Sequence, residues 1–122
     1  MNGSELLHEA GALVASGWCQ GEEATRDAGE PADVRDGTAT RWSLLGALQA
    51  AALSDGSTRV EDVAVAVGAI AELISDPSLA NWNDEPGRTS DDVGLLLERA
   101  QALAADQLRD VELPPAPLRV VI

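Results

Sequence analysis

Apolar residues recur along this chain at the three-four spacing that is typical of amphipathic helices. Four segments with this pattern are separated by stretches rich in glycine, proline and acidic residues. The second segment is apolar on nearly all sides, which is typical of a central, buried helix. The predicted helices span residues 4–16, 39–53, 58–75 and 89–108.

Local signals mark the starts of two of these helices. Thr58 with Glu61, and Thr89 with Asp92, have the spacing of a capping box, in which the N-cap and the third helical residue exchange hydrogen bonds. Gly46 lies inside the second predicted helix, where a glycine costs about 1 kcal/mol relative to alanine. We expect the close approach of a neighbouring helix to compensate for it.

Two segments lack helical periodicity. Residues 18–38 exceed the usual ~12–15 residues of a structureless loop, so we predict a long irregular connection with a short hairpin near residues 27–29. The end of the chain contains three prolines followed by apolar residues, and it cannot continue a helix. We predict one helical domain over residues 1–109, and an extended tail over residues 110–122 that packs on the domain or on a second chain.

The composition favours a helical fold. The 122 residues are the size of one domain, and 45% of them are hydrophobic. With three tryptophans, no phenylalanine and no tyrosine, the core must consist mainly of aliphatic side chains. We therefore predict an all-α fold, a small irregular four-helix bundle, in which the three tryptophans lie close together.

The net charge of −13 excludes some partners. Such a surface repels nucleic-acid backbones and anionic lipids, so we expect no direct nucleic-acid binding and no membrane association. The apolar runs are too short for a membrane span and no signal-peptide pattern is present, so we expect a cytoplasmic protein. The acidic surface either serves solubility or acts as a nucleic-acid mimic or a ligand for a basic partner.

The segment around residues 81–93 combines turn chemistry with functional groups. A Glu-Pro-Gly sequence at residues 85–87 predicts a tight turn. In one interpretation the flanking polar groups tie this turn, with Asp84 paired to Arg88 or to Arg41. In the other they form a pocket in which Arg88 binds a carboxylate, a phosphate or another small-molecule ligand. The candidate binding residues are Trp18, Arg41, Trp42, Trp82, Asn83, Asp84 and Arg88.

A catalytic thiol is a weaker candidate. Cys19 could be a nucleophile activated by His8 if the first helix folds back on the following loop, but a buried free cysteine usually acts as a small hydrophobe. One cysteine alone cannot form a zinc cluster, and the acidic residues at 27–33 lack the spacing of a calcium loop. We therefore predict no metal and no cofactor.

Three blocks of sequence resemble a known family. They read Gly-Trp-Cys-Gln-Gly at residues 17–21, Arg-Trp-Ser-Leu-Leu-Gly-Ala-Leu at residues 41–48, and Trp-Asn-Asp with Gly-Arg-Thr at residues 82–84 and 87–89. Together they resemble a family of short proteins from GC-rich bacteria and their phages that is known as a domain of unknown function. The resemblance covers roughly residues 6–104 and implies one domain without a stated activity.

Two functional hypotheses follow. The first is a non-enzymatic interaction module that acts through a protein partner or through self-association. The second is a small helical enzyme or ligand-binding protein that uses the tryptophan-lined polar pocket. Convergent side chains in an open cleft would favour the second hypothesis, whereas a dry, fully paired cluster would favour the first.

Overall fold

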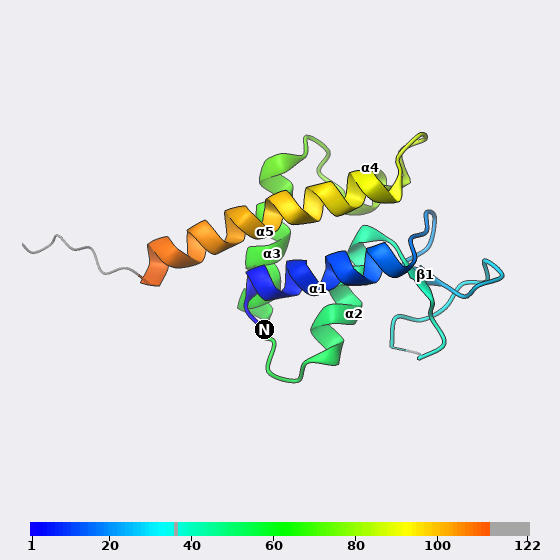
Figure 1. Ribbon diagram of the computed structural model, residues 1–122, viewed down its shortest axis with the longest axis horizontal. Coiled ribbons are helices and arrows are strands. Elements are labelled where there is room, and N and C mark those ends of the chain that lie inside the picture. Colours follow the sequence, from blue (N-terminus) through cyan, green and yellow to red (C-terminus); the bar gives the residue numbers. More distant parts are fainter. Residues whose placement is uncertain (36, 113–122) are drawn as a thin grey trace, which may run out of the picture.

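The computed structural model of the protein describes residues 1–35 and 37–112. These residues form five helices and one two-stranded sheet, so the fold is mostly helical (Figure 1). The elements in chain order are α1 (Gly3–Ser16), β1 (Ala24–Thr25), β2 (Arg41–Trp42), α2 (Leu44–Ser54), α3 (Val60–Leu73), α4 (Leu79–Asp84) and α5 (Ser90–Glu112).

The prediction of an all-α four-helix bundle is therefore confirmed only as a mostly helical fold. The short helix α4 and the sheet were not predicted, because six-residue helices and two-residue strands are too short to show a period. In the sheet, β1 and β2 run antiparallel with Ala24 opposite Trp42. Helix α5 extends into the first residues of the predicted tail, and residues 113–122, with their predicted packing, lie outside the described residues.

Helix α1 occupies the centre of the packing. Helices α5, α2 and α3 all pack against it, and α1 and α5 lie side by side (Figure 1). The central position expected for residues 39–53 thus belongs to α1. Many core residues are alanines, which allow helix axes to approach closely. The buried core consists of Leu6, Leu7, Ala10, Val14, Leu44, Ala47, Leu48, Ala51, Ala66, Ala69, Ile70, Val93, Leu96, Leu97, Ala100 and Ala104.

Side-chain caps fix the starts of α1 and α5. In α1, the Asn2 side-chain oxygen accepts from the Glu5 amide at 2.9 Å, and the Glu5 carboxylate accepts from the Asn2 amide at 2.8 Å. The predicted capping box of α5 is confirmed: the Thr89 hydroxyl accepts from the Asp92 amide at 3.2 Å, and the Asp92 carboxylate accepts from the Thr89 amide at 3.0 Å.

Helix α3 starts later than predicted. The Thr58 hydroxyl donates to the Asp55 carboxylate at 3.3 Å, so the predicted Thr58–Glu61 capping box is wrong. The Arg59 amide donates instead to the Asp62 carboxylate at 3.0 Å. Val60 is 83% exposed and lies outside the buried face of the helix.

Helix α2 also starts later, because Arg41 and Trp42 form the second strand. The Ser43 hydroxyl then caps the helix by accepting from the Gly46 amide at 3.1 Å. The close approach at Gly46 exists, but the neighbour is the Glu23 backbone and not a helix. A Cβ on Gly46 would lie 1.8 Å from the Glu23 carbonyl oxygen, which also accepts from the Ser43 amide at 3.0 Å.

The irregular connection contains the predicted turn. The Arg26 amide donates to the Glu30 carbonyl, and the Gly29 amide donates back to the Arg26 carbonyl, both at 2.9 Å. Gly29 has a φ of +86°, a left-handed conformation that glycine adopts without a steric penalty. This turn places β1 next to the start of α2, where the Glu23 backbone contacts Gly46.

Replacement of Gly46 by alanine should destabilise the domain. The new methyl group would force the Glu23 backbone away from the start of α2, and overpacking of this kind costs about 1–3 kcal/mol. The free energy of unfolding, measured in urea, gives the value. Gly68→Ala is the matched control: it lies in α3 with open space around a Cβ, so it should stabilise the helix by about 0.5–1 kcal/mol. Equal effects of the two substitutions would refute the steric explanation.

Candidate functional site

The buried amide of Asn83 lies at the centre of the predicted site. Its side-chain oxygen accepts from the Trp18 indole N–H at 2.8 Å and from the Leu44 amide at 3.0 Å. Its nitrogen donates to the Cys19 carbonyl at 3.1 Å and to the Asp84 carboxylate at 3.0 Å. Asn83 is fully buried, and these four bonds use the whole hydrogen-bonding capacity of the amide.

Asn83 reaches this position because α4 is held at both ends. At its start, the Ser78 hydroxyl accepts from the Asn81 amide at 3.2 Å. At its end, the Arg88 amide donates to the Glu85 carbonyl at 3.0 Å, and Gly87 has a φ of +87°. This geometry confirms the predicted tight turn. The bond from Asn83 to the Leu44 amide satisfies one of the free N–H groups at the start of α2.

Asp84 pairs with neither of the two arginines proposed from the sequence. Its carboxylate accepts from the Gly21 amide at 2.9 Å and from the Asn83 side chain. Among the described residues, no ion pair joins it to Arg88 or to Arg41, which is exposed on β2. The residue therefore fastens the loop after α1 to the end of α4.

Gln20 reinforces the same junction, and sequence reasoning missed it. Its side-chain amide donates to the Asn83 carbonyl at 2.9 Å and to the Glu85 carbonyl at 3.1 Å. The only sequence signal for this role was the position of Gln20 in the block at residues 17–21, next to Trp18 and Cys19. Loop 17–21 and helix α4 are thus bound through side-chain amides as well as through the Trp18 indole.

Arg88 is fixed against Trp82. Its guanidinium carbon lies 3.8 Å from the centre of the Trp82 ring, and its Nε donates to the Trp82 carbonyl at 2.9 Å. A cation over an indole face is attracted by the electrons of the ring. The two interactions hold the guanidinium in one orientation and leave its terminal nitrogens outside this contact.

Backbone contacts bring two of the three tryptophans together, and the prediction that all three lie close together stays a prediction. Trp18 and Trp42 lie on adjacent backbones: the Trp42 amide donates to the Gly17 carbonyl at 3.0 Å, and the Cys19 amide donates to the Trp42 carbonyl at 3.3 Å. Trp82 is linked to them through its neighbour Asn83. All three are partly buried against the core.

His8 and Cys19 do not form a catalytic pair in the described structure. His8 is exposed on α1 and lines a separate surface pocket with residues such as Glu5 and Gln101. The Cys19 thiol donates to the Glu22 carbonyl at 3.5 Å. Burial raises the pKa of the Cys19 thiol above its usual value, which disfavours the nucleophilic thiolate.

The described part of the chain contains neither a cluster of metal ligands nor a membrane-spanning helix. No group of three or more histidine, cysteine, aspartate or glutamate side chains there could hold a metal ion. None of the described helices is both long enough and apolar enough to cross a membrane.

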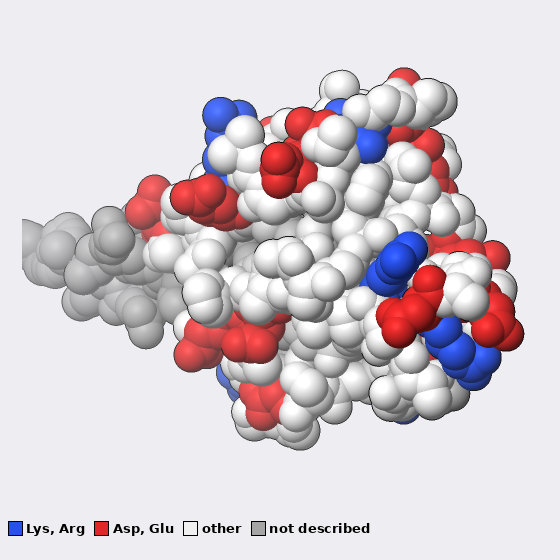
Figure 2. Space-filling model, turned by 45° about the vertical axis from the view of Figure 1, so that its right-hand side comes forward, with Lys and Arg blue, Asp and Glu red and all other residues white. Residues whose placement is uncertain are grey.

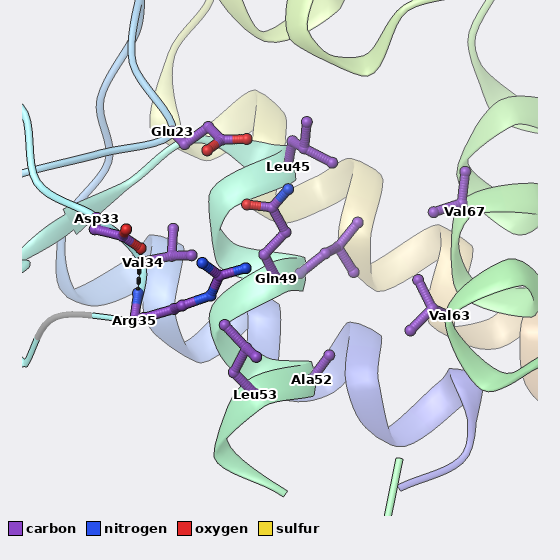
Figure 3. A pocket seen from close by; sticks show the side chains of 11 residues that line it. Glu23, Asp33, Val34, Arg35, Leu45, Gln49, Ala52, Leu53, Val63 and Val67 are labelled. Carbon is purple, nitrogen blue, oxygen red and sulfur yellow. Dashed lines mark hydrogen bonds between the residues drawn. The ribbon is translucent and has the colours of Figure 1, made fainter. Parts of the chain in front are cut away.

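A cavity lies elsewhere in the described structure, between α2, α3 and the loop at residues 33–35 (Figure 3). Its volume is about 510 Å³. Both helices pack on α1 but contact each other only marginally, which leaves a groove between them. In Figure 3, Val63 and Val67 point across this groove toward α2. The lining residues are Glu23, Asp33, Val34, Arg35, Leu45, Leu48, Gln49, Ala52, Leu53, Val63 and Val67.

A second cavity adjoins this groove and is acidic. Its volume is about 330 Å³, and it shares Glu23 and Leu45 with the groove. Glu22 and Asp84 line its other walls, so Asp84 is the one predicted site residue that reaches this region. We call the two cavities together the α2–α3 groove, with an apolar end and an acidic end. The sequence analysis did not predict this groove. The one signal for it was that residues 44–53 are apolar on nearly all sides.

A third cavity, of about 230 Å³, lies beside Trp82 and Arg88. It shares no lining residue with the α2–α3 groove. Its lining residues come from the end of α3, from α4 and the turn after it, and from one face of α5. They are Leu73, Ile74, Trp82, Arg88, Asp92, Leu95, Leu96 and Arg99.

Comparison with known proteins identifies a family without assigning an activity. A family model described as "Family of unknown function (DUF6197)" matches residues 2–103. The match supports the resemblance to a family of unknown function that the sequence blocks suggested. Neither the curated proteins nor the solved structures contain a match to the chain.

Replacement of Asn83 by aspartate should destabilise the domain by at least about 2 kcal/mol. A carboxylate oxygen would replace the donor that faces the Cys19 carbonyl and the Asp84 carboxylate, so both contacts become repulsive in a buried site. The matched control is Asn81→Asp, which makes the same charge change at an exposed position of α4 and should alter stability by less than about 0.5 kcal/mol. Urea unfolding followed by circular dichroism measures both. Similar stabilities of the two variants would refute a central role for Asn83.

Alkylation of Cys19 should be slow in the folded protein. Because the raised pKa leaves less thiolate at a given pH, iodoacetamide at about pH 8 should react more slowly than with free cysteine, and the rate should rise to a midpoint at higher pH. The urea-unfolded chain provides the control and should react at the ordinary rate. A folded protein that reacts faster than the unfolded chain would revive the nucleophile hypothesis.

Proposed function

The chain belongs to the DUF6197 family, whose function is unknown, and from the geometry of this member we propose that it is a non-enzymatic interaction module. Its proposed ligand is an amphipathic, basic helical segment of a partner protein, bound in the α2–α3 groove. The observation that carries the proposal is the groove itself, with apolar walls at one end and acidic side chains at the other.

The shape of the groove suits a helix. Its apolar part falls within the ~300–1,000 Å³ range of ligand sites, and helices α2 and α3 form two of its walls. Residues 33–35 and Glu23 of the irregular connection complete the lining. Leu53 is 54% exposed on the α2 side, so apolar surface remains available to a partner. An amphipathic helix laid between α2 and α3 would bury this surface in the way that helix-in-groove complexes do.

The charges of the groove favour a basic partner. Glu22, Glu23 and Asp84 line its acidic end, and Asp33 lies on the rim of the apolar part beside Arg35. On the face shown in Figure 2, acidic side chains form several clusters separated by uncharged surface. With a net charge of −13, the protein would attract a cationic partner at long range and repel a second copy of itself. We therefore propose a different protein as the partner.

The polar cluster around Asn83 supports a structural role over a catalytic one. Its amide is fully used by internal bonds, and the Asp84 carboxylate fastens loop 17–21 to α4. A catalytic group must instead have an atom free to meet a substrate. These residues then shape the acidic wall of the groove. We place the interaction in the cytoplasm, where the single cysteine, Cys19, would stay reduced.

A peptide titration tests this proposal. The probe is a synthetic amphipathic helix of about 14 residues, roughly four turns, with a leucine face and lysine flanks. Two matched peptides replace the lysines by glutamates or the leucines by serines. We expect amide chemical-shift changes in α2 and α3 with the first peptide, and binding at least about tenfold weaker with each of the others, because each lacks one of the two contributions.

Matched variants localise the binding. The Glu22→Gln/Glu23→Gln double variant should weaken the basic peptide about two- to tenfold, since each exposed ion pair contributes modestly. The Asp91→Asn/Glu98→Gln variant changes the net charge equally on the α1–α5 side of the molecule, where these residues line another pocket. Equal weakening by both variants, or equal binding of the serine peptide, would show mere charge attraction and refute the proposal.

A further inference from the structure

The pocket beside Trp82 has a composition that the proposed groove does not explain. In a protein with 21 acidic residues and 8 arginines, two of the arginines, Arg88 and Arg99, line the same small pocket. Its walls are otherwise apolar, except for Asp92. Leu73 and Leu95, which line this pocket, are 42% and 46% exposed, so apolar surface is available to a ligand.

Arg88 is held in a fixed orientation beside this pocket. Its Nε donates to the Trp82 carbonyl, and its guanidinium carbon lies over the indole, 3.8 Å from the ring centre. The guanidinium therefore loses little freedom on binding, and its terminal nitrogens remain to donate to a ligand. A fixed guanidinium of this kind matches the two oxygens of a carboxylate, whereas a lysine ammonium would act only as a point charge.

Arg99 reaches the same pocket from α5. Asp92, Leu95, Leu96 and Arg99 have the three-four spacing of one helix face. In the described part of the chain, no carboxylate forms an ion pair with Arg88 or Arg99, whereas Arg26 and Arg59 each have an acidic neighbour at 4.0 Å or less. The two pocket arginines thus lack an anionic partner within the described structure.

We propose that this pocket binds a small organic monocarboxylate with a short apolar body. The carboxylate lies between Arg88 and Arg99, and the apolar body covers Leu73 and Leu95. The volume of about 230 Å³ excludes a large ligand. A monoanion fits better than a phosphate dianion, because the lining carries two positive charges against the one negative charge of Asp92.

The distant acidic residues do not prevent such binding. At physiological ionic strength, interactions between exposed charges decay over about 8 Å. The charges that line the pocket therefore dominate. The Asp92 carboxylate is also engaged, because it accepts from the Thr89 amide as part of the capping box of α5.

The test uses hexanoate as the probe, with acetate and 1-hexanol as matched ligands that lack the apolar body or the charge. Nuclear magnetic resonance follows the Arg88 side-chain Nε–H and the Trp82 indole N–H. We expect hexanoate to shift both signals in a saturable way, and acetate and 1-hexanol to bind at least about tenfold more weakly. Equal binding of acetate would indicate unspecific anion adsorption, and the absence of saturable shifts with hexanoate would also overturn the proposal.

Variants assign the two arginines. Arg99→Gln should weaken hexanoate about tenfold, the range expected for one hydrogen bond to a charged group, with an unchanged melting temperature because Arg99 has no described partner. The control is Arg59→Gln, the same substitution at the start of α3, which should leave hexanoate binding unchanged. Arg88→Lys should abolish hexanoate binding. If the Arg88→Lys variant does not fold, the effect of Arg99→Gln on hexanoate binding still tests the proposal. Equal effects at positions 99 and 59 would overturn the proposal.

Discussion

The side-chain amide of Asn83 is the interaction on which the arrangement of this protein depends. It is fully buried and makes four hydrogen bonds, which reach the loop after α1, the first turn of α2 and the neighbouring Asp84. Leaving any of these buried groups without a partner would cost about 1–3 kcal/mol. The amide therefore fixes the position of α4 relative to α1 and α2, and with it the acidic wall of the α2–α3 groove.

A second constraint is the close contact of small residues. Gly46 allows the Glu23 backbone to lie against the start of α2, and alanines such as Ala10, Ala66 and Ala100 bring the helices close to α1. Because α2 and α3 both pack on α1 and hardly on each other, the space between them stays open. The groove is thus a consequence of how the core is built around one central helix.

The sequence predicted those features whose signals are local. Helices α1 and α5 were predicted from periodicity, and the start of α5 also from capping, since Thr89 and Asp92 are three residues apart and interact as expected. The motif around Trp82 was recognised, but the partners of Asn83 and Asp84 were not, because they lie 39 to 65 residues away in the chain. The groove was missed because an apolar helix does not reveal which of its sides a neighbour leaves uncovered.

The sequence separation of these contacts has a consequence for folding. Closing a chain segment of 65 residues, as the bond from Trp18 to Asn83 requires, costs conformational entropy that local helix formation does not. The packing of α1 on α5 closes a longer segment still, since the Ser4 hydroxyl donates to the Gln101 carbonyl, and it brings the loop after α1 toward α4, which precedes α5. We therefore expect the junction of loop 17–21 with α4 to follow that packing. The acidic wall of the groove would then be completed only after α1 has packed on α5, so only the fully folded chain would offer its partner both ends of the groove.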